Sequence, residues 1–305
     1  MMNNAIRRKV GVLAVSFFLL GSKCQSRQDS FDKNIGKRAM VFTEELISFG
    51  PRPPQSEALG KVKQWLQTRA ADLGLASKIQ DFTAKTPLGQ IKMSNVLVTI
   101  PAKQNNASQV VIVAHYDSKK FENFTFVGAN DAASSVGLLL ALAENIPKET
   151  LPFEVVFVFV DGEEALVEWS RSDSLYGSRH FVQSLSDKTK IKAAIVVDMV
   201  GDSDLKLIHS ATSDQKLADM FEQALKAKNE ESYLDHKSTS VEDDHTPFVE
   251  AGIPTLHLMD FTYGGAETPG TYWHTYADTM EHISDASLTI VGHGILGVLE
   301  KLAQP

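Results

Sequence analysis

Two adjacent glutamates, Glu163 and Glu164, follow directly after an apolar run and a glycine. The segment reads FVFVDGEEA over residues 157–165, so the pair stands where a buried strand would leave its sheet. Neighbouring side chains on an extended chain point to opposite faces, and a turn at Gly162 would bring both carboxylates to one site. One carboxylate could then bind a divalent ion while the other transfers protons. A solvated pair at a helix start is the plain alternative.

Other polar side chains stand at the ends of apolar runs or beside glycine-rich stretches. They are His115, Asp131, Asp198, His257 and His274. Polar groups at the carboxyl ends of buried strands meet at one crevice in an open α/β sheet. Imidazole and carboxylate donors without thiolates suit zinc.

Each of these residues also has an ordinary interpretation when it is taken alone. His115 fits a hydrogen-bonded core histidine, Asp131 a helix N-cap and Asp198 a turn residue at a strand end. Their joint occurrence, with the glutamate pair, favours a metal site over those readings.

Several motifs in this chain resemble the glutaminyl cyclase branch of the zinc aminopeptidase superfamily. The motifs are AHYDSK (114–119), GANDAASS (128–135), DGEEA (161–165), DSLYGSRH (173–180), VDMVGD (197–202), EDDHTPF (242–248) and WHT (273–275). The resemblance extends from about residue 38 to the C-terminus and keeps the motif order. DGEEA and WHT indicate only the superfamily, whereas DSLYGSRH and EDDH, with Trp169 and Trp273, indicate the cyclase branch.

The resemblance implies a glutaminyl-peptide cyclotransferase that converts N-terminal glutamine of peptides or proteins to pyroglutamate and releases ammonia. It implies one zinc ion (Zn2+) held by Asp131, Glu164 and His274, with an open position for substrate. Glu163 would be the acid/base, in a carboxylate network with Asp198 and Asp243. The residues that would line the substrate pocket are Trp169, His257 and Trp273.

Two alternatives use the same scaffold. In related aminopeptidases, the residues matching His115 and Asp198 hold a second zinc, with that matching Asp131 as the bridge, and both are present here. A dinuclear zinc aminopeptidase is therefore the second hypothesis. A non-catalytic binding protein is a distant third, because this chain keeps every ligand and Glu163.

The chain departs from the animal cyclases in two places. The segment between His257 and Trp273 is longer and contains Gly264, Gly265 and Gly270, so we expect a different loop at the pocket mouth. The disulfide that animal members often carry near the active site cannot form, because Cys24 is the only cysteine.

Composition indicates one enzyme domain. The chain has 305 residues, 43% hydrophobic and 22% charged, and apolar runs alternate with helical patterns. We therefore predict a single α/β domain over 38–305, with a central mixed, largely parallel β-sheet flanked by helices. The formal charge of −8 and the absence of basic blocks argue against nucleic acid as a partner, and we expect a monomer.

The N-terminus has a different character. Arg7, Arg8 and Lys9 precede an apolar run over 10–20, which is typical of a secretory signal. Residues 1–24 are predicted to be this signal and residues 25–37 a polar tether. Cys24 stands where a lipid would be attached to an exported bacterial protein, but Lys23 replaces the small residue expected before it. The sequence thus predicts export, leaving open a periplasmic or membrane-anchored lipoprotein and a secreted protein.

Overall fold

A mixed sheet forms the centre of the molecule in the computed structural model, which describes residues 34–236 and 240–304. Its strands are β1 (Ala76–Thr86), β2 (Gly89–Ile100), β3 (Gln109–His115), β4 (Glu154–Val160), β5 (Ile191–Asp198) and β6 (Thr255–Met259), in the order β1-β2-β4-β3-β5-β6. The strands β4, β3, β5 and β6 are parallel, whereas β1 and β2 form an antiparallel hairpin at one edge. The predicted α/β fold with a largely parallel sheet is confirmed.

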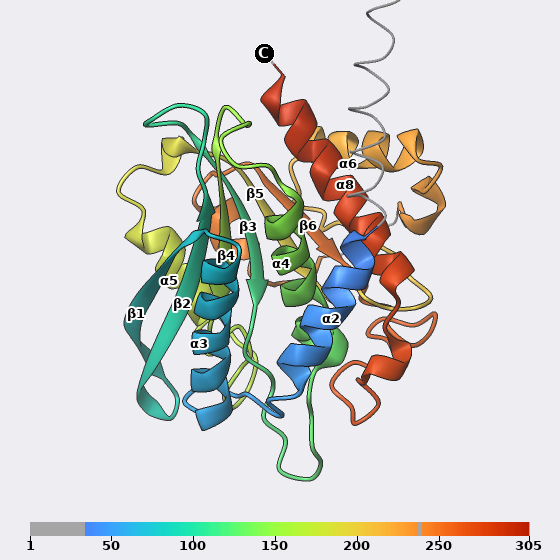
Figure 1. Ribbon diagram of the computed structural model, residues 1–305. Coiled ribbons are helices and arrows are strands. Elements are labelled where there is room, and N and C mark those ends of the chain that lie inside the picture. The colour runs from blue at the N-terminus through green and yellow to red at the C-terminus, as the bar shows by residue number, and fades with distance from the viewer. Residues whose placement is uncertain (1–33, 237–239, 305) are drawn as a thin grey trace, which may run out of the picture.

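Helices cover both faces of the sheet (Figure 1). The larger apolar core contains residues of α2 (Ile35–Ile47), α3 (Glu57–Asp72), α4 (Ser135–Asn145), α6 (Gln215–Ala227) and α8 (Asp285–Ala303). The smaller core lies against α5 (Tyr176–Ser184) and α7 (Thr246–Glu250). Short helical turns occupy Ala129–Ser134, Lys188–Lys190, Glu231–Tyr233 and Met280–His282. Because both faces are covered, the parallel strands are continuous apolar runs.

Alternate residues of these strands enter different cores. On β3, Val110 and Ile112 contribute to the larger core, while Val111 and Val113 contribute to the smaller one. The helix α8 is long and apolar enough to cross a membrane by length and composition, but it packs against α2 and α6 as a core helix.

Two features differ from the sequence-based expectations. The helix α2 begins at Ile35, so residues 35–37 of the predicted tether belong to the folded domain. The strand β2 pairs along its length with β1. The polar strand β1 was not predicted, because its mostly exposed edge position leaves no apolar run. The predicted signal, with Cys24, and residues 25–33 of the tether lie outside the described residues.

The topology gathers three strand ends at one place. The chain passes from β3 to β4 on one side and then to β5 on the other, so the strand order reverses at β3. A crevice forms outside the carboxyl ends of strands at such a switch point. His115 ends β3, Asp198 ends β5, and the glutamate pair follows β4.

One buried arginine ties the N-terminal segment to this crevice. Arg52 has no exposed surface, and its guanidinium donates to the carbonyl oxygens of Tyr116 (3.0 Å), Gly128 (3.1 Å) and Val127. Burial lowers the pKa of Arg52 to about 10, although nearby carboxylates, first Asp117, oppose that shift. The Pro-rich segment after α2 therefore places the Arg52 guanidinium next to the buried carboxylates of the crevice.

We expect Arg52→Met to lower the free energy of unfolding by about 3 kcal/mol or more, because three carbonyl groups lose their buried donor and the nearby buried carboxylates lose a compensating cation. Arg171→Met is the matched control. The Arg171 side chain is 77% exposed and makes an ion pair with Glu250, so its removal should cost less than about 1 kcal/mol. Urea unfolding of both variants measures the difference, and equal losses would contradict the role given to Arg52.

Candidate metal centre and active site

Three potential zinc ligands come together from segments that are distant in sequence. His274 Nε2 lies 3.0 Å from Glu164 Oε1 and 3.2 Å from Asp131 Oδ2. The candidate ligand atoms of the three residues lie within 4.8 Å of one another. Asp131 and Glu164 are buried, and His274 is partly buried. Two carboxylates and one imidazole converging in this way are a donor set that fits zinc.

The electrostatics of this group favour a bound cation. Burial alone would lower the pKa of His274, but the carboxylates of Glu164 and Asp131 raise it to about 10. Burial would raise the pKa of Asp131, and the imidazoles of His115 and His274 nevertheless hold it below its ordinary value. The same field that attracts a proton attracts a divalent ion, which would compete with that proton for the imidazole.

Asp131 belongs to a second group as well. His115 Nε2 lies 3.1 Å from Asp131 Oδ1 and 3.4 Å from Asp198 Oδ1, and the three residues have ligand atoms within 4.8 Å of one another. Both ring nitrogens of His115 are buried, and Nδ1 lies 3.5 Å from Asp117 Oδ1. The donors of the hypothesised dinuclear site are therefore also brought together, with one oxygen of Asp131 in each group.

A tight turn at Gly162 precedes the two glutamates. Gly162 has φ +70°, and a Cβ there would lie 2.7 Å from Met93 Sδ, so glycine is required. The carboxylate of Asp117 accepts the backbone N–H groups of Glu163 (3.2 Å) and Glu164 (3.4 Å). The structure thus fixes the backbone of both glutamates as they leave β4.

Glu163 lies in a cluster of buried carboxyl groups. Burial raises its pKa well above the ordinary value; Glu164, Asp243 and Asp244 raise it further, and the imidazole of His115 opposes them. Burial likewise raises the pKa of Asp198 to about 6, against the hydrogen bond from His115. Glu163 and Asp198 therefore keep a proton to higher pH than isolated carboxyl groups would. Asp244, within the EDDH motif, belongs to the cluster but was not predicted to.

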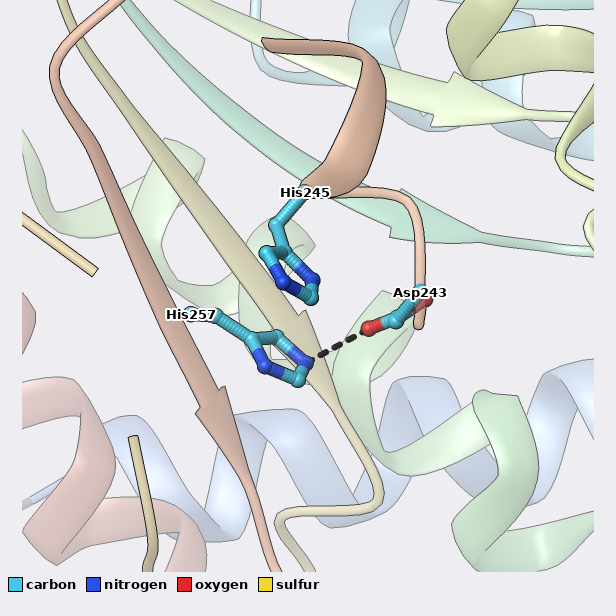
Figure 2. A group of neighbouring side chains, drawn as sticks. All are labelled: Asp243, His245 and His257. Carbon is cyan, nitrogen blue, oxygen red and sulfur yellow. Dashed lines mark ion pairs between the residues drawn. The ribbon is translucent and has the colours of Figure 1, made fainter. Parts of the chain in front are cut away.

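Asp243 is held by a histidine from β6 (Figure 2). His257 Nε2 lies 2.6 Å from Asp243 Oδ2, and the ring of His245 stacks on that of His257 at 4.1 Å and 11°. Burial tends to raise the pKa of Asp243, but the hydrogen bond and charge of His257 lower it. Ligand atoms of these three residues also lie within 4.8 Å of one another. His257 was expected to stand at a strand end, but it lies inside β6, paired with Val196.

Aromatic side chains surround His274. Trp273 stacks on its ring at 4.0 Å and 16°, and Phe261 meets Trp273 edge-on at 5.3 Å. Phe121 and Phe126 contact the His274 ring edge-on at 5.7 and 5.9 Å. Trp273 therefore lies beside the candidate metal centre, and the two phenylalanines form a wall that the motifs did not predict.

Trp169 occupies a separate loop and is 39% exposed. The buried carboxylate of Asp173 organises this loop by accepting the N–H groups of Leu166 (3.0 Å), Val167 (2.8 Å) and Glu168 (3.0 Å). The sequence placed Asp173 in a motif without giving it a role. Its position four residues after an aromatic loop residue was the only available signal.

Asp117 and Asp278 were also missed as positioning residues. Asp117 follows His115 by two residues, and Asp278 follows His274 by four residues. Asp278 accepts the N–H groups of Asn130 (2.7 Å) and Asp131 (3.2 Å). A carboxylate this close in sequence to a candidate ligand is a usable signal for a group that orients the site.

Comparisons with known proteins agree with this geometry. The family model described as Peptidase family M28 matches residues 95–299. The "Glutaminyl-peptide cyclotransferase-like protein" of Mus musculus is 34% identical over 265 residues, covering 76% of this chain and 67% of the relative. The protein of that name from Bos taurus is 31% identical over 264 residues, with the same coverage.

Solved structures share the fold. The crystal structure of Acidobacteriales bacterium glutaminyl cyclase has a TM-score of 0.82 and 35% identity, covering 88% of this chain and 94% of that one. A Zn-dependent exopeptidase from Parabacteroides distasonis, with a TM-score of 0.78, 20% identity and coverage of 88% and 98%, shares the fold alone. The chain therefore belongs to peptidase family M28 and, within it, to the glutaminyl-peptide cyclotransferase branch.

Proposed function

We propose that this protein is a zinc-dependent acyltransferase, a glutaminyl-peptide cyclotransferase that acts on peptides or proteins with N-terminal glutamine. The observation that supports the proposal most is the convergence of Asp131, Glu164 and His274 beside Glu163, a buried carboxyl group whose pKa is raised. The relatives and the Acidobacteriales bacterium structure carry the same activity in their names.

In the proposed site, Asp131, Glu164 and His274 would hold one zinc ion. A bound zinc supplies a Lewis acid that polarises the side-chain carbonyl of the substrate glutamine and stabilises negative charge on its oxygen. The remaining steps depend on the protein's own residues.

Glu163 is the proposed acid/base. Its carboxylate takes a proton from the substrate α-amine as the amine nitrogen bonds to the side-chain carbonyl carbon. It then returns the proton to the amide nitrogen as the carbon–nitrogen bond breaks, so that ammonia leaves and pyroglutamate remains. A raised pKa suits this role, because the acid form must be available when ammonia departs.

Asp198 and Asp243 complete the proposed network with Glu163. Their charges influence one another, and His257 fixes Asp243 from inside β6. We propose that His257 acts on the substrate pocket indirectly, by positioning Asp243. Trp169 and Trp273 are proposed to line the pocket and contact the substrate directly. Apolar walls of this kind keep water from the polarised carbonyl, where hydrolysis would compete with cyclisation.

A dinuclear zinc aminopeptidase is the second candidate. The observation that favours it is the group formed by His115, Asp131 and Asp198, which could hold a second ion and activate water. We rank it lower because the Bos taurus and Mus musculus relatives, which are 31% and 34% identical to this chain, carry cyclotransferase names.

We further propose export to the periplasm or the cell exterior, from the basic and apolar signal pattern of residues 1–24. Lipid attachment at Cys24 would anchor the protein to a membrane, and plain secretion is the other outcome. A monomeric state and the absence of nucleic-acid partners complete the proposal, the latter from the formal charge of −8.

The decisive experiment uses mass spectrometry on a short peptide with N-terminal glutamine, incubated with purified zinc-loaded protein. We expect loss of one ammonia with the rest of the peptide intact. Loss of the whole first residue would instead identify an aminopeptidase and make His115 and Asp198 second-metal ligands. A peptide with N-terminal alanine is the control and should stay unchanged.

Glu163→Gln should reduce turnover by at least about 100-fold, since an amide cannot carry the proton between the two nitrogens. The zinc content of the variant should stay the same, because Glu163 is not among the proposed ligands. Elemental analysis and the rate of ammonia release check both statements. Near-normal activity would remove Glu163 from the mechanism.

Asp173→Asn should raise KM about 10-fold with little change in kcat, because the loop that carries Trp169 loses acceptors while the metal centre is untouched. Backbone N–H donors hold the pKa of Asp173 below its ordinary value despite the opposing effect of burial. The Asp173 carboxylate therefore stabilises the loop fully above about pH 4, the ordinary aspartate pKa. This stabilisation is lost only as the pH falls through the lower pKa that Asp173 has in the folded protein.

Asp187→Asn is the matched control for this prediction. Asp187 caps an exposed turn by accepting from Thr189, outside the active site. Steady-state kinetics between pH 5 and 9 should show a constant ratio of KM between Asp173→Asn and the unsubstituted protein, and an unchanged KM for the control. A fall in kcat with constant KM would assign Asp173 to the chemical step instead.

A further inference from the structure

The glycine-rich segment between His257 and Trp273 contains one tyrosine that is completely buried. Tyr263 has no exposed surface, and its hydroxyl donates to Asp278 Oδ1 at 2.9 Å. A buried phenol in a glycine-rich loop needs such a partner, because an unpaired hydroxyl would lose its hydration without compensation. The loop therefore reaches into the molecule at this point.

Asp278 connects this tyrosine to two of the proposed zinc ligands. Its Oδ1 atom also accepts the N–H of Asn130, and its Oδ2 atom accepts the N–H of Asp131. Its own N–H donates to Thr275 O at 3.3 Å, in the turn that follows His274. One buried carboxylate thus joins the backbone of Asp131 to the segment that carries His274.

We propose that Tyr263 is a positioning residue for the metal centre, which fixes the Asp278 carboxylate and through it the proposed zinc ligand Asp131. The inference rests on the proposed function, because it assigns Tyr263 to the same site. The hydroxyl supplies a further donor to a carboxylate that is only 1% exposed. Without that donor, Asp278 would turn more freely and hold the N–H groups of Asn130 and Asp131 less closely.

The fold of the loop does not depend on this hydroxyl. Gly264 N donates to Asp202 Oδ2 (3.1 Å), Gly270 N donates to Phe261 O (2.9 Å), and Tyr272 N donates to Tyr263 O (3.2 Å). These contacts use backbone groups or other side chains. Removing the hydroxyl alone should therefore leave the loop in place and remove only one hydrogen bond donated to the Asp278 carboxylate.

Phe261 gives the same loop a second contact with the site. Its ring packs edge-on against Trp273, next to His274. The segment from Phe261 to Tyr263 thus contacts Trp273 through Phe261 and, by way of Asp278, the backbone of Asp131 through Tyr263. This arrangement makes the loop a support for the metal centre.

The test compares Tyr263→Phe with Tyr272→Phe, which removes a hydroxyl from the same loop. Tyr272 stacks on His282 at 3.9 Å, and its hydroxyl makes no hydrogen bond with residues 34–236 or 240–304. For each purified protein we would measure zinc release to a chelator, the visible spectrum after replacement of zinc by cobalt(II), kcat and KM.

We expect Tyr263→Phe to release zinc about 10-fold faster and to shift the cobalt spectrum, with a lower kcat and a nearly constant KM. Tyr272→Phe should match the unsubstituted protein. Asp278→Asn should have a larger effect and release zinc about 100-fold faster. An amide has only one oxygen that can accept hydrogen bonds, whereas both oxygens of the Asp278 carboxylate accept them.

Unchanged zinc release and an unchanged cobalt spectrum in Tyr263→Phe would overturn the proposal. Equal effects in both phenylalanine variants would also overturn it, because they would show a general loosening of the loop. Failure of the unsubstituted protein to release ammonia from a glutamine peptide would overturn the proposed function instead, while zinc release and the cobalt spectrum would still test the role of Tyr263.

Discussion

The concentration of buried negative charge around Asp131 is the constraint on which the rest of the structure depends. Asp131 stands between the imidazoles of His115 and His274, one for each carboxylate oxygen. Isolated buried carboxylates are unstable unless cations or hydrogen-bond donors compensate them. Arg52 lies below the crevice as a buried cation, and the N–H groups of Glu163 and Glu164 compensate Asp117. Many of the polar contacts described above serve this requirement.

The fold meets this requirement through its topology. Parallel strands that reverse order at β3 bring residues from three strand ends to one crevice, and buried helices prevent water from screening their charges. The hydrophobic strands therefore also give the site its low dielectric environment. Stability and chemistry therefore share the same strands, and β3 and β5 end at the site residues His115 and Asp198.

Much of this arrangement could be predicted from sequence. Apolar runs located β3, β4 and β5, and the polar residues at or just beyond the end of each run identified His115, Glu163, Glu164 and Asp198. Contacts made across long sequence separations could not be predicted in this way. Arg52 lies in a segment that reads only as a helix break, and Asp278 accepts from Asn130 and Asp131, which are more than a hundred residues away in the sequence. The edge strand β1 was missed because exposure on an edge removes the apolar pattern.

The glycine-rich loop has a consequence for the thermodynamics of recognition. Its glycines would be expected to make a flexible segment, yet backbone hydrogen bonds and the packing of Phe261 and Tyr263 fix it. A loop ordered before ligand arrives loses little conformational entropy when ligand binds. In the proposed enzyme this loop would act as a preformed part of the receptor, so that selection among peptides would depend on the shape of their first residue more than on rearrangement of the protein.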